Sequence, residues 1–93
     1  MFNNTNVQSV QHCLDAYLQR IGKVEIDEIE ANQELARAGV LADDQKHPGN
    51  PLREFLSKLR DSNKLPANVR QLYGFWKIKH SKSIMKMIQI LQF

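Results

Sequence analysis

Hydrophobic residues recur at helical spacing along the first quarter of the chain, between polar capping residues and a glycine. The repeating positions are Val7, Val10, Leu14, Tyr17, Leu18 and Ile21. Thr5 or Asn6 can cap the start of such a helix, and Gly22 suits the left-handed position that follows a helix end. The pattern predicts a first helix within residues 1–22, with residues 1–4 frayed.

A second periodic stretch is short and strongly acidic. Asp27 is a candidate cap and Gly39 closes the stretch, which predicts a helix from about Glu28 to Ala38. The positions expected to be buried are Ile29, Leu35 and Ala36, and the positions expected on the outside are Glu28, Glu30 and Glu34. Because an acidic surface repels phosphate, we expect this helix to act as a scaffold and not as a contact element.

The third periodic stretch carries the clearest start signal, after a long turn over residues 42–50. Asn50 is a good N-cap, and Pro51 suits the first helical position, where its missing N–H has no partner to lose. Its apolar stripe consists of Leu52, Phe55, Leu56 and Leu59. Away from that stripe, Arg53, Ser57, Arg60 and Lys64 fall within roughly 60° at 100° per residue. The sequence predicts a helix to about residue 63 with a basic stripe in solvent.

A β-hairpin is predicted after Leu65-Pro66, since a residue that precedes proline is pushed out of the helical region. Its strands cover residues 67–71 and 75–79, and Gly74 gives the tip a permissive backbone. Strand alternation puts Trp76 with Ile78 on one face, and Phe75, Lys77 and Lys79 on the other. We expect Trp76 to anchor the core. Tyr73 and Phe75, near the tip, are the better candidates for stacking on bases. Residues 24–26 could add a short strand.

Residues 82–93 predict a last helix, capped by Ser81 or Ser83 and apolar almost all round. Such a helix either closes the core or meets another chain. One possibility is a homodimer through Met87, Ile88, Leu91 and Phe93. The predicted fold is a single α+β domain, mainly α, over residues 1–93, with the element order α-α-α-β-β-α.

The charge changes sign along the chain. The net charge is +3, but residues 23–46 carry −4 and residues 47–93 carry +7. The basic half is the half with the hairpin, which favours a polyanionic partner; a solvated basic face is the alternative. The 42% hydrophobic content is ordinary for a globular protein, and no apolar run or leader indicates a membrane or secretion. We therefore expect a cytoplasmic protein.

Candidate chemistry is sparse. The single cysteine, Cys13, excludes an intrachain disulfide, and His12 beside it lacks the further ligands that a zinc site needs. The four glycines are isolated, so they form no phosphate-binding loop, and no Ser-His-acid or Cys-His arrangement is suggested. We expect no enzymatic activity, no cofactor, no metal and no small-molecule substrate.

The second half of the chain resembles a known family of small DNA-binding proteins. The residues that carry the resemblance are Asn63-Lys64-Leu65-Pro66-Ala67, Gly74, Trp76-Lys77-Ile78 and Ser81. They are similar to winged helix-turn-helix phage excisionases and mercury-resistance-type regulators, in which a Gly-Lys-Leu-Pro-like turn, a short wing and a Trp-x-Ile strand follow a helix. The similarity covers about residues 25–90. Residues 53–61 less closely resemble an Arg-x-x-Leu-x-x-Leu-Arg-Asp helix of winged-helix domains appended to restriction enzymes.

The chain departs from the excisionase-like pattern in three places. It has an extra N-terminal helix, a long turn that contains Pro48-Gly49, and Asn63 where the family usually has glycine. Asparagine tolerates positive φ, so it can take that position.

The resemblance implies binding of double-stranded DNA, with the third helix in the major groove and the wing on the backbone or minor groove. The candidate contact residues are Arg53, Ser57, Lys58, Arg60, Lys64, Arg70, Gln71, Lys77 and Lys79. Guanidinium groups at Arg53 and Arg60 suit guanine edges, and the lysines and Ser57 suit phosphates. The wing residues Arg70 and Gln71 would reach the groove. We expect the helix and the ribbon to form one continuous anion-attracting surface.

Two matters stay open at this point. The resemblance does not distinguish a transcription regulator, an excision factor and a restriction accessory. The alternative function is a non-catalytic protein-interaction module on the same scaffold, acting through the apolar C-terminal helix, because a fold by itself does not fix a function.

Overall fold

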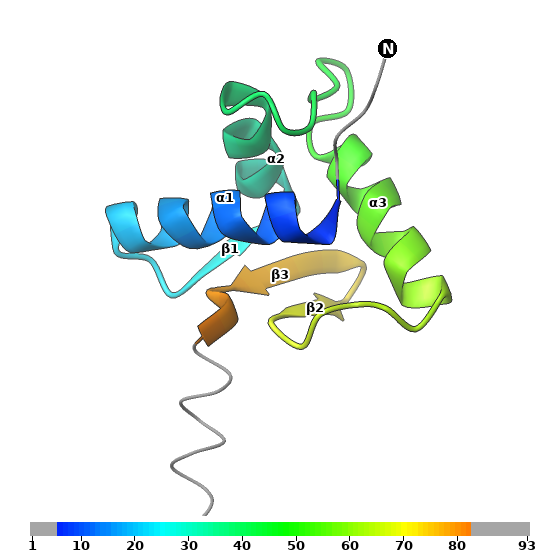
Figure 1. Ribbon diagram of the computed structural model, residues 1–93. Helices are drawn as coiled ribbons and strands as arrows, with labels where there is room; N and C mark the ends of the chain where they lie inside the picture. The colour runs from blue at the N-terminus through cyan, green and yellow to red at the C-terminus, as the bar shows by residue number, and fades with distance from the viewer. Residues whose placement is uncertain (1–5, 83–93) are drawn as a thin grey trace, which may run out of the picture.

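The computed structural model describes residues 6–82 as an α+β fold of three helices and one three-stranded antiparallel sheet (Figure 1). The elements are α1 (Val7–Ile21), β1 (Glu25–Asp27), α2 (Glu28–Arg37), α3 (Asn50–Asp61), β2 (Val69–Leu72) and β3 (Phe75–Lys79). The predicted order of elements is therefore corrected by the strand β1 between the first two helices. Residues 83–93, which include Met87, Ile88, Leu91 and Phe93 and most of the predicted last helix, lie outside the described residues.

Helix α1 has the caps that its sequence indicates. The Asn6 side-chain oxygen accepts a hydrogen bond from the Ser9 N–H at 2.8 Å. Gly22 follows the helix with φ +74°, and its N–H donates to the Leu18 carbonyl. The apolar stripe of the helix is buried at Val10 and Leu14 as well as at Leu18. The predicted extent of the first helix is confirmed.

The sheet has the order β1-β3-β2, so the Trp76 strand lies in the middle. In register, Ile78 of β3 faces Ile26 on one side and Val69 on the other. Trp76, Ile78 and Ile26 are buried in the core that the sheet shares with the helices. The helices gather on one side of the sheet, with α1 lying across it and α3 at one end (Figure 1). The prediction that Trp76 anchors the core is confirmed.

Helix α2 has the predicted position, but its predicted faces are wrong in part: Leu35 is buried as expected, whereas Glu28 and Glu34, expected outside, are buried too. Its buried residues are Glu28, Ala31, Asn32, Glu34 and Leu35, whereas Ile29 is 37% exposed. The helix packs between α1, α3 and the sheet, so the residues that point inward are those that can pack against, or pair with, side chains of these elements. Glu34 meets the guanidinium of Arg37 at 2.6 Å and that of Arg20 at 3.3 Å. Buried carboxylates with cationic partners are invisible to a hydropathy pattern.

The start of α3 depends on a residue from another helix. The helix begins at Asn50, one residue earlier than predicted, after Gly49 at φ +85°. Gly49 has no side chain to cap the helix, and the Oδ1 atom of Asn32 accepts the Leu52 N–H instead, at 3.0 Å. A Cβ at Gly49 would lie 3.1 Å from the Ile29 Cα, so the close approach of α2 also requires glycine here.

The end of α3 agrees with the expectation from the sequence. Asn63 has φ +58°, and the Lys64 N–H then donates to the Leu59 carbonyl at 2.8 Å. Asparagine thus takes the left-handed position that a glycine usually fills after a helix.

The helices within residues 6–82 lack the length and apolar character needed to cross a bilayer.

Candidate nucleic-acid interface

The end of α3 and the hairpin meet through two of the predicted contact residues. The Arg60 Nη1 donates to the Gln71 Oε1 at 2.6 Å. The same guanidinium lies 5.8 Å from the centre of the Trp76 ring, within the range of a cation–π interaction. Both Arg60 and Gln71 are exposed, so water or a ligand can reach the pair. The pair fixes the position of β2 relative to the last turn of α3.

Of the other predicted residues on α3 and just after it, the two lysines have free charges. Lys58 and Lys64 are exposed, and Ser57 is half-buried. Within residues 6–82, neither lysine takes part in an ion pair, so both ammonium groups are available to an anion. Glu54 and Asp61 lie on the same helix and reduce its net charge. This region is therefore basic at Lys58 and Arg60 on α3 and at Lys64 just after it, without being basic throughout.

Arg53 has a structural partner that the sequence did not reveal. Its Nη2 lies 2.8 Å and its Nε 3.2 Å from the Glu28 Oε2, and the Glu28 side chain is fully buried. The other oxygen of Glu28 accepts the Trp76 N–H at 3.2 Å. The pair thus joins α3 to α2 and β3. Reading a base with Arg53 would leave the buried Glu28 carboxylate without its partner. Arg60 is the better-placed guanidinium, because its partners Gln71 and Asp61 are exposed and water can replace it there.

The remaining basic residues of the hairpin lie on the outer face of the sheet. Trp76 and Ile78 face the helices, so Lys77 and Lys79 face away from them. Arg70 is in register with Lys77 and shares its face. The expected continuous surface is therefore wrong in part. Because α3 packs on the core face, strand alternation separates these three cations from the cations of α3.

Acidic side chains next to these cations reduce the positive electrostatic potential of the outer face of the sheet. Arg70 Nη2 lies 3.5 Å from the Glu25 Oε2, on the far edge strand. Glu25 is also in register with Lys79. Cross-strand pairs of this kind hold the sheet together more than they attract a partner.

The tip of the hairpin is apolar and exposed. Leu72, Tyr73 and Phe75 are 41%, 92% and 54% exposed. Leu72 pairs with Phe75 in register, so the loop has only two residues, Tyr73 at φ +53° and Gly74 at φ +81°. The stacking hypothesis named Tyr73 and Phe75 but missed the left-handed tyrosine. A two-residue loop with glycine second, typical of a type I′ turn, was the signal for it.

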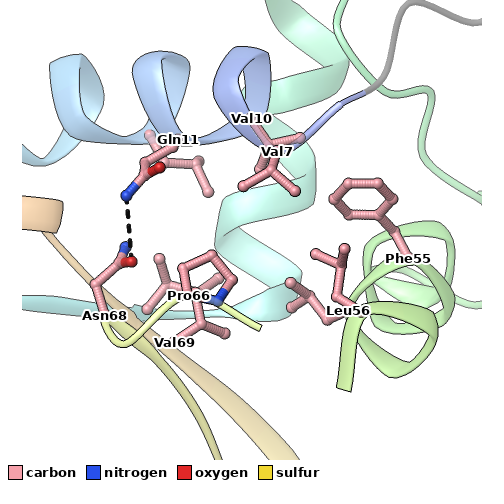
Figure 2. A pocket seen from close by; sticks show the side chains of 11 residues that line it. Val7, Val10, Gln11, Phe55, Leu56, Pro66, Asn68 and Val69 are labelled. Atoms are coloured by element: carbon pink, nitrogen blue, oxygen red, sulfur yellow. Dashed lines mark hydrogen bonds between the residues drawn. The ribbon is translucent and has the colours of Figure 1, made fainter. Parts of the chain in front are cut away.

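The groove between α1, α3 and the start of β2 is a packing defect more than a ligand site (Figure 2). Its volume is about 20 Å³, close to the minimum of about 10–15 Å³ that a single water needs. Apolar side chains such as Val10, Phe55 and Val69 line most of it, and one hydrogen bond, from Gln11 to Asn68 at 3.3 Å, crosses it. A small-molecule substrate would not fit.

Other candidate chemistry is also weak within residues 6–82. That part of the chain has no group of three His, Cys, Asp or Glu side chains that could hold a metal ion. Burial raises the pKa of the Cys13 thiol, which disfavours the reactive thiolate. The surface around Arg60, Gln71 and the hairpin tip is the strongest candidate site.

Comparison of the chain with family models, with curated proteins and with solved structures gives no match.

Proposed function

We propose that this protein binds double-stranded DNA as a winged helix-turn-helix domain, with α3 in the major groove and the β2–β3 hairpin beside it. The major groove of B-DNA is about 12 Å wide and admits an α-helix, and a ribbon next to that helix can follow the backbone or the minor groove. The order of α2, α3 and hairpin along the chain supports this mode of binding.

One observation carries the proposal: the contact between Arg60 and Gln71, with its 2.6 Å hydrogen bond. The contact brings the hairpin next to the last turn of α3, so that a single duplex can touch both. Lys58 lies two positions before Arg60 and Lys64 four positions after it, and both have free ammonium groups. The chain also has no Asp or Glu after Asp61, which leaves the hairpin region free of acidic groups of its own that would repel phosphate.

The geometry changes the roles that the sequence implied. Arg60 is the candidate for a guanine edge, and Lys58 and Lys64 for phosphates. Arg53 supports α3 through Glu28. Arg70, Lys77 and Lys79 face away from α3 and would touch only a duplex that bends around the hairpin.

A charge-matched pair of variants tests the proposal. The affinity of the full chain for a mixed-sequence duplex is measured by fluorescence anisotropy at several salt concentrations. Lys58→Ala with Lys64→Ala should weaken binding and reduce the slope of log affinity against log salt by about 0.9 for each phosphate that is no longer neutralised. Lys77→Ala with Lys79→Ala removes the same charge from the outer sheet face and should have the smaller effect.

Two results would contradict the proposal. If the wild-type chain fails to bind duplex DNA even at low salt, DNA is not its ligand. If the two double variants lose affinity equally, binding responds to net charge alone, and α3 does not read a groove. Arg60→Ala, tested on a sequence selected from a random pool, should cost about 1–3 kcal/mol at one base-pair position.

A further inference from the structure

The hairpin tip is a feature that groove binding by α3 leaves unexplained. Its loop residue Tyr73 is 92% exposed and has a left-handed backbone conformation, φ +53°. Asparagine and glycine adopt that conformation easily, whereas a bulky side chain there is strained. Since strained residues persist at functional positions, the tyrosine calls for a role outside the packing of the fold.

The apolar side chains at the tip are grouped. Leu72 and Phe75 form the register pair next to the loop, and both are about half exposed, so three large side chains lie at the end of the hairpin. They do not belong to the core cluster. The Tyr73 hydroxyl forms no hydrogen bond with any residue in the described part of the chain. Replacing Tyr73 would therefore not disturb the packing of the core.

Cations stand close behind the tip. Arg70 and Lys77 form a register pair two rungs from the Leu72–Phe75 pair. At about 3.4 Å per residue they stand roughly 7 Å behind it. On the side of the hairpin toward α3, Gln71 binds Arg60. Arg70 shares its charge with Glu25, and Arg60 shares its charge with Asp61. Within the hairpin itself, residues 69–79, every charged side chain is nevertheless basic, which is the complement of a groove bordered by phosphates.

We propose that this tip is an apolar wedge for duplex DNA, in which the Tyr73 ring enters the minor groove and stacks on a base step that it partly opens. Apolar side chains inserted between base steps in this way are a known means of minor-groove binding. An aromatic ring can stack on any base, so the contact adds affinity without demanding a sequence. Because this inference depends on the proposed function, its test must separate failure of the wedge from failure of DNA binding.

An anionic lipid surface is the other partner that an aromatic tip with cations could meet. Three apolar side chains on a two-residue loop bury little area, and stable membrane anchoring takes more than one weak signal. The tip also adjoins Arg60 on α3, which a flat membrane would not engage together with the hairpin. The observations therefore favour the duplex.

The decisive variant is Tyr73→Asn, with Val24→Asn as the matched control. Asn-Gly is the preferred pair for a two-residue hairpin loop, so Tyr73→Asn should melt at the same or a higher temperature. Its affinity for a mixed-sequence duplex should fall about tenfold, since stacking is lost. The slope against salt should stay unchanged, since no phosphate contact is removed. Val24 is 74% exposed and precedes β1 at the end of the sheet opposite the hairpin tip, so its replacement should leave affinity unchanged.

A spectroscopic variant reports stacking directly. Tyr73→Trp places an indole at the tip, and duplex DNA should quench its emission, while the wild-type chain, whose single tryptophan Trp76 is buried, supplies the baseline. Quenching that equals the wild-type baseline would contradict insertion.

The outcomes separate the two proposals. If the wild-type chain binds the duplex and Tyr73→Asn binds equally well, the wedge is wrong and groove binding by α3 stands. If the salt slope falls with the affinity, or Val24→Asn loses as much, the tip does not stack on bases. If Tyr73→Asn loses binding only to phosphatidylserine vesicles, the tip is a lipid contact. If the wild-type chain does not bind duplex DNA, the proposed function itself is wrong.

Discussion

Removal of the Arg53 side chain tests whether this arginine supports the fold or reads DNA. Arg53→Ala leaves the Glu28 carboxylate inside the core without the guanidinium that bonds it at 2.8 and 3.2 Å. Loss of one partner of a buried ion pair costs about 3–5 kcal/mol. Arg53 is 41% exposed, so water would replace part of the interaction, and we expect about 2–3 kcal/mol. The folded state should remain populated at room temperature but become clearly less stable.

The measurement is thermal and urea unfolding followed by circular dichroism. For a domain of this size, 1 kcal/mol corresponds to about 4–8 °C in Tm, so Arg53→Ala should lower Tm by about 10–20 °C. Arg60→Ala is the control, because its partners Gln71 and Asp61 are exposed, and it should cost less than about 1 kcal/mol.

A double-mutant cycle assigns the effect to the pair. Glu28→Gln removes the buried charge but keeps an acceptor for the Trp76 N–H. In that background Arg53→Ala should cost much less than in the wild type. If Arg53→Ala changes stability by no more than Arg60→Ala, or if the two changes at Glu28 and Arg53 are additive, the structural role assigned to Arg53 is wrong.

Three further variants test other parts of the fold. Asn32→Ala should lower the free energy of unfolding by about 2 kcal/mol in urea, since the Leu52 N–H loses its acceptor; no change would contradict the cap between helices. Gly49→Ala should cost about 1–3 kcal/mol in the same assay, because alanine at φ +85° is strained; a neutral result would mean that the turn can relax. The Arg37 guanidinium holds the pKa of the Glu34 carboxyl below its usual range. The ionised Glu34 therefore stabilises the fold above the pKa of an unfolded glutamate, about 4.3, and this stabilisation is lost as the pH falls through the lower pKa of the folded state. Unfolding measured between pH 7 and pH 3 should therefore show a smaller acid loss for Glu34→Gln than for the wild type, and identical curves would contradict this.

Local patterns predicted the parts of the fold that depend on local interactions. The spacing of Val10, Leu14 and Leu18 placed α1, and its caps lie next to it in the sequence. In the same way, alternation along 75–79 placed Trp76 in the core, and Gly74 placed the turn. The periods of a helix and a strand are properties of the backbone, so they can be recognised in a single sequence from the spacing of its apolar residues.

The candidate site was only partly accessible to this reasoning. The basic stripe of α3 was recognised, but the choice between Arg53 and Arg60 was not, because it depends on a carboxylate from α2. The exposed aromatic tip was noted, yet its left-handed tyrosine became evident only with the register of β2 and β3. Residues of like charge look the same in a sequence until their partners are known.

The sequence by itself determined the helices α1 and α3 with their apolar faces, the position of α2, the hairpin and the basic character of the second half. The place of β1 in the order of elements and the inward face of α2 came from the tertiary structure. Tertiary structure decided which polar groups are buried and which face each cation occupies. Asn32 caps a helix 18 residues away, and Glu28 inside the core holds Arg53. The physical reason is that burial of a charged or polar side chain is favourable only where a distant segment supplies its partner, and the positions of such segments are set by packing.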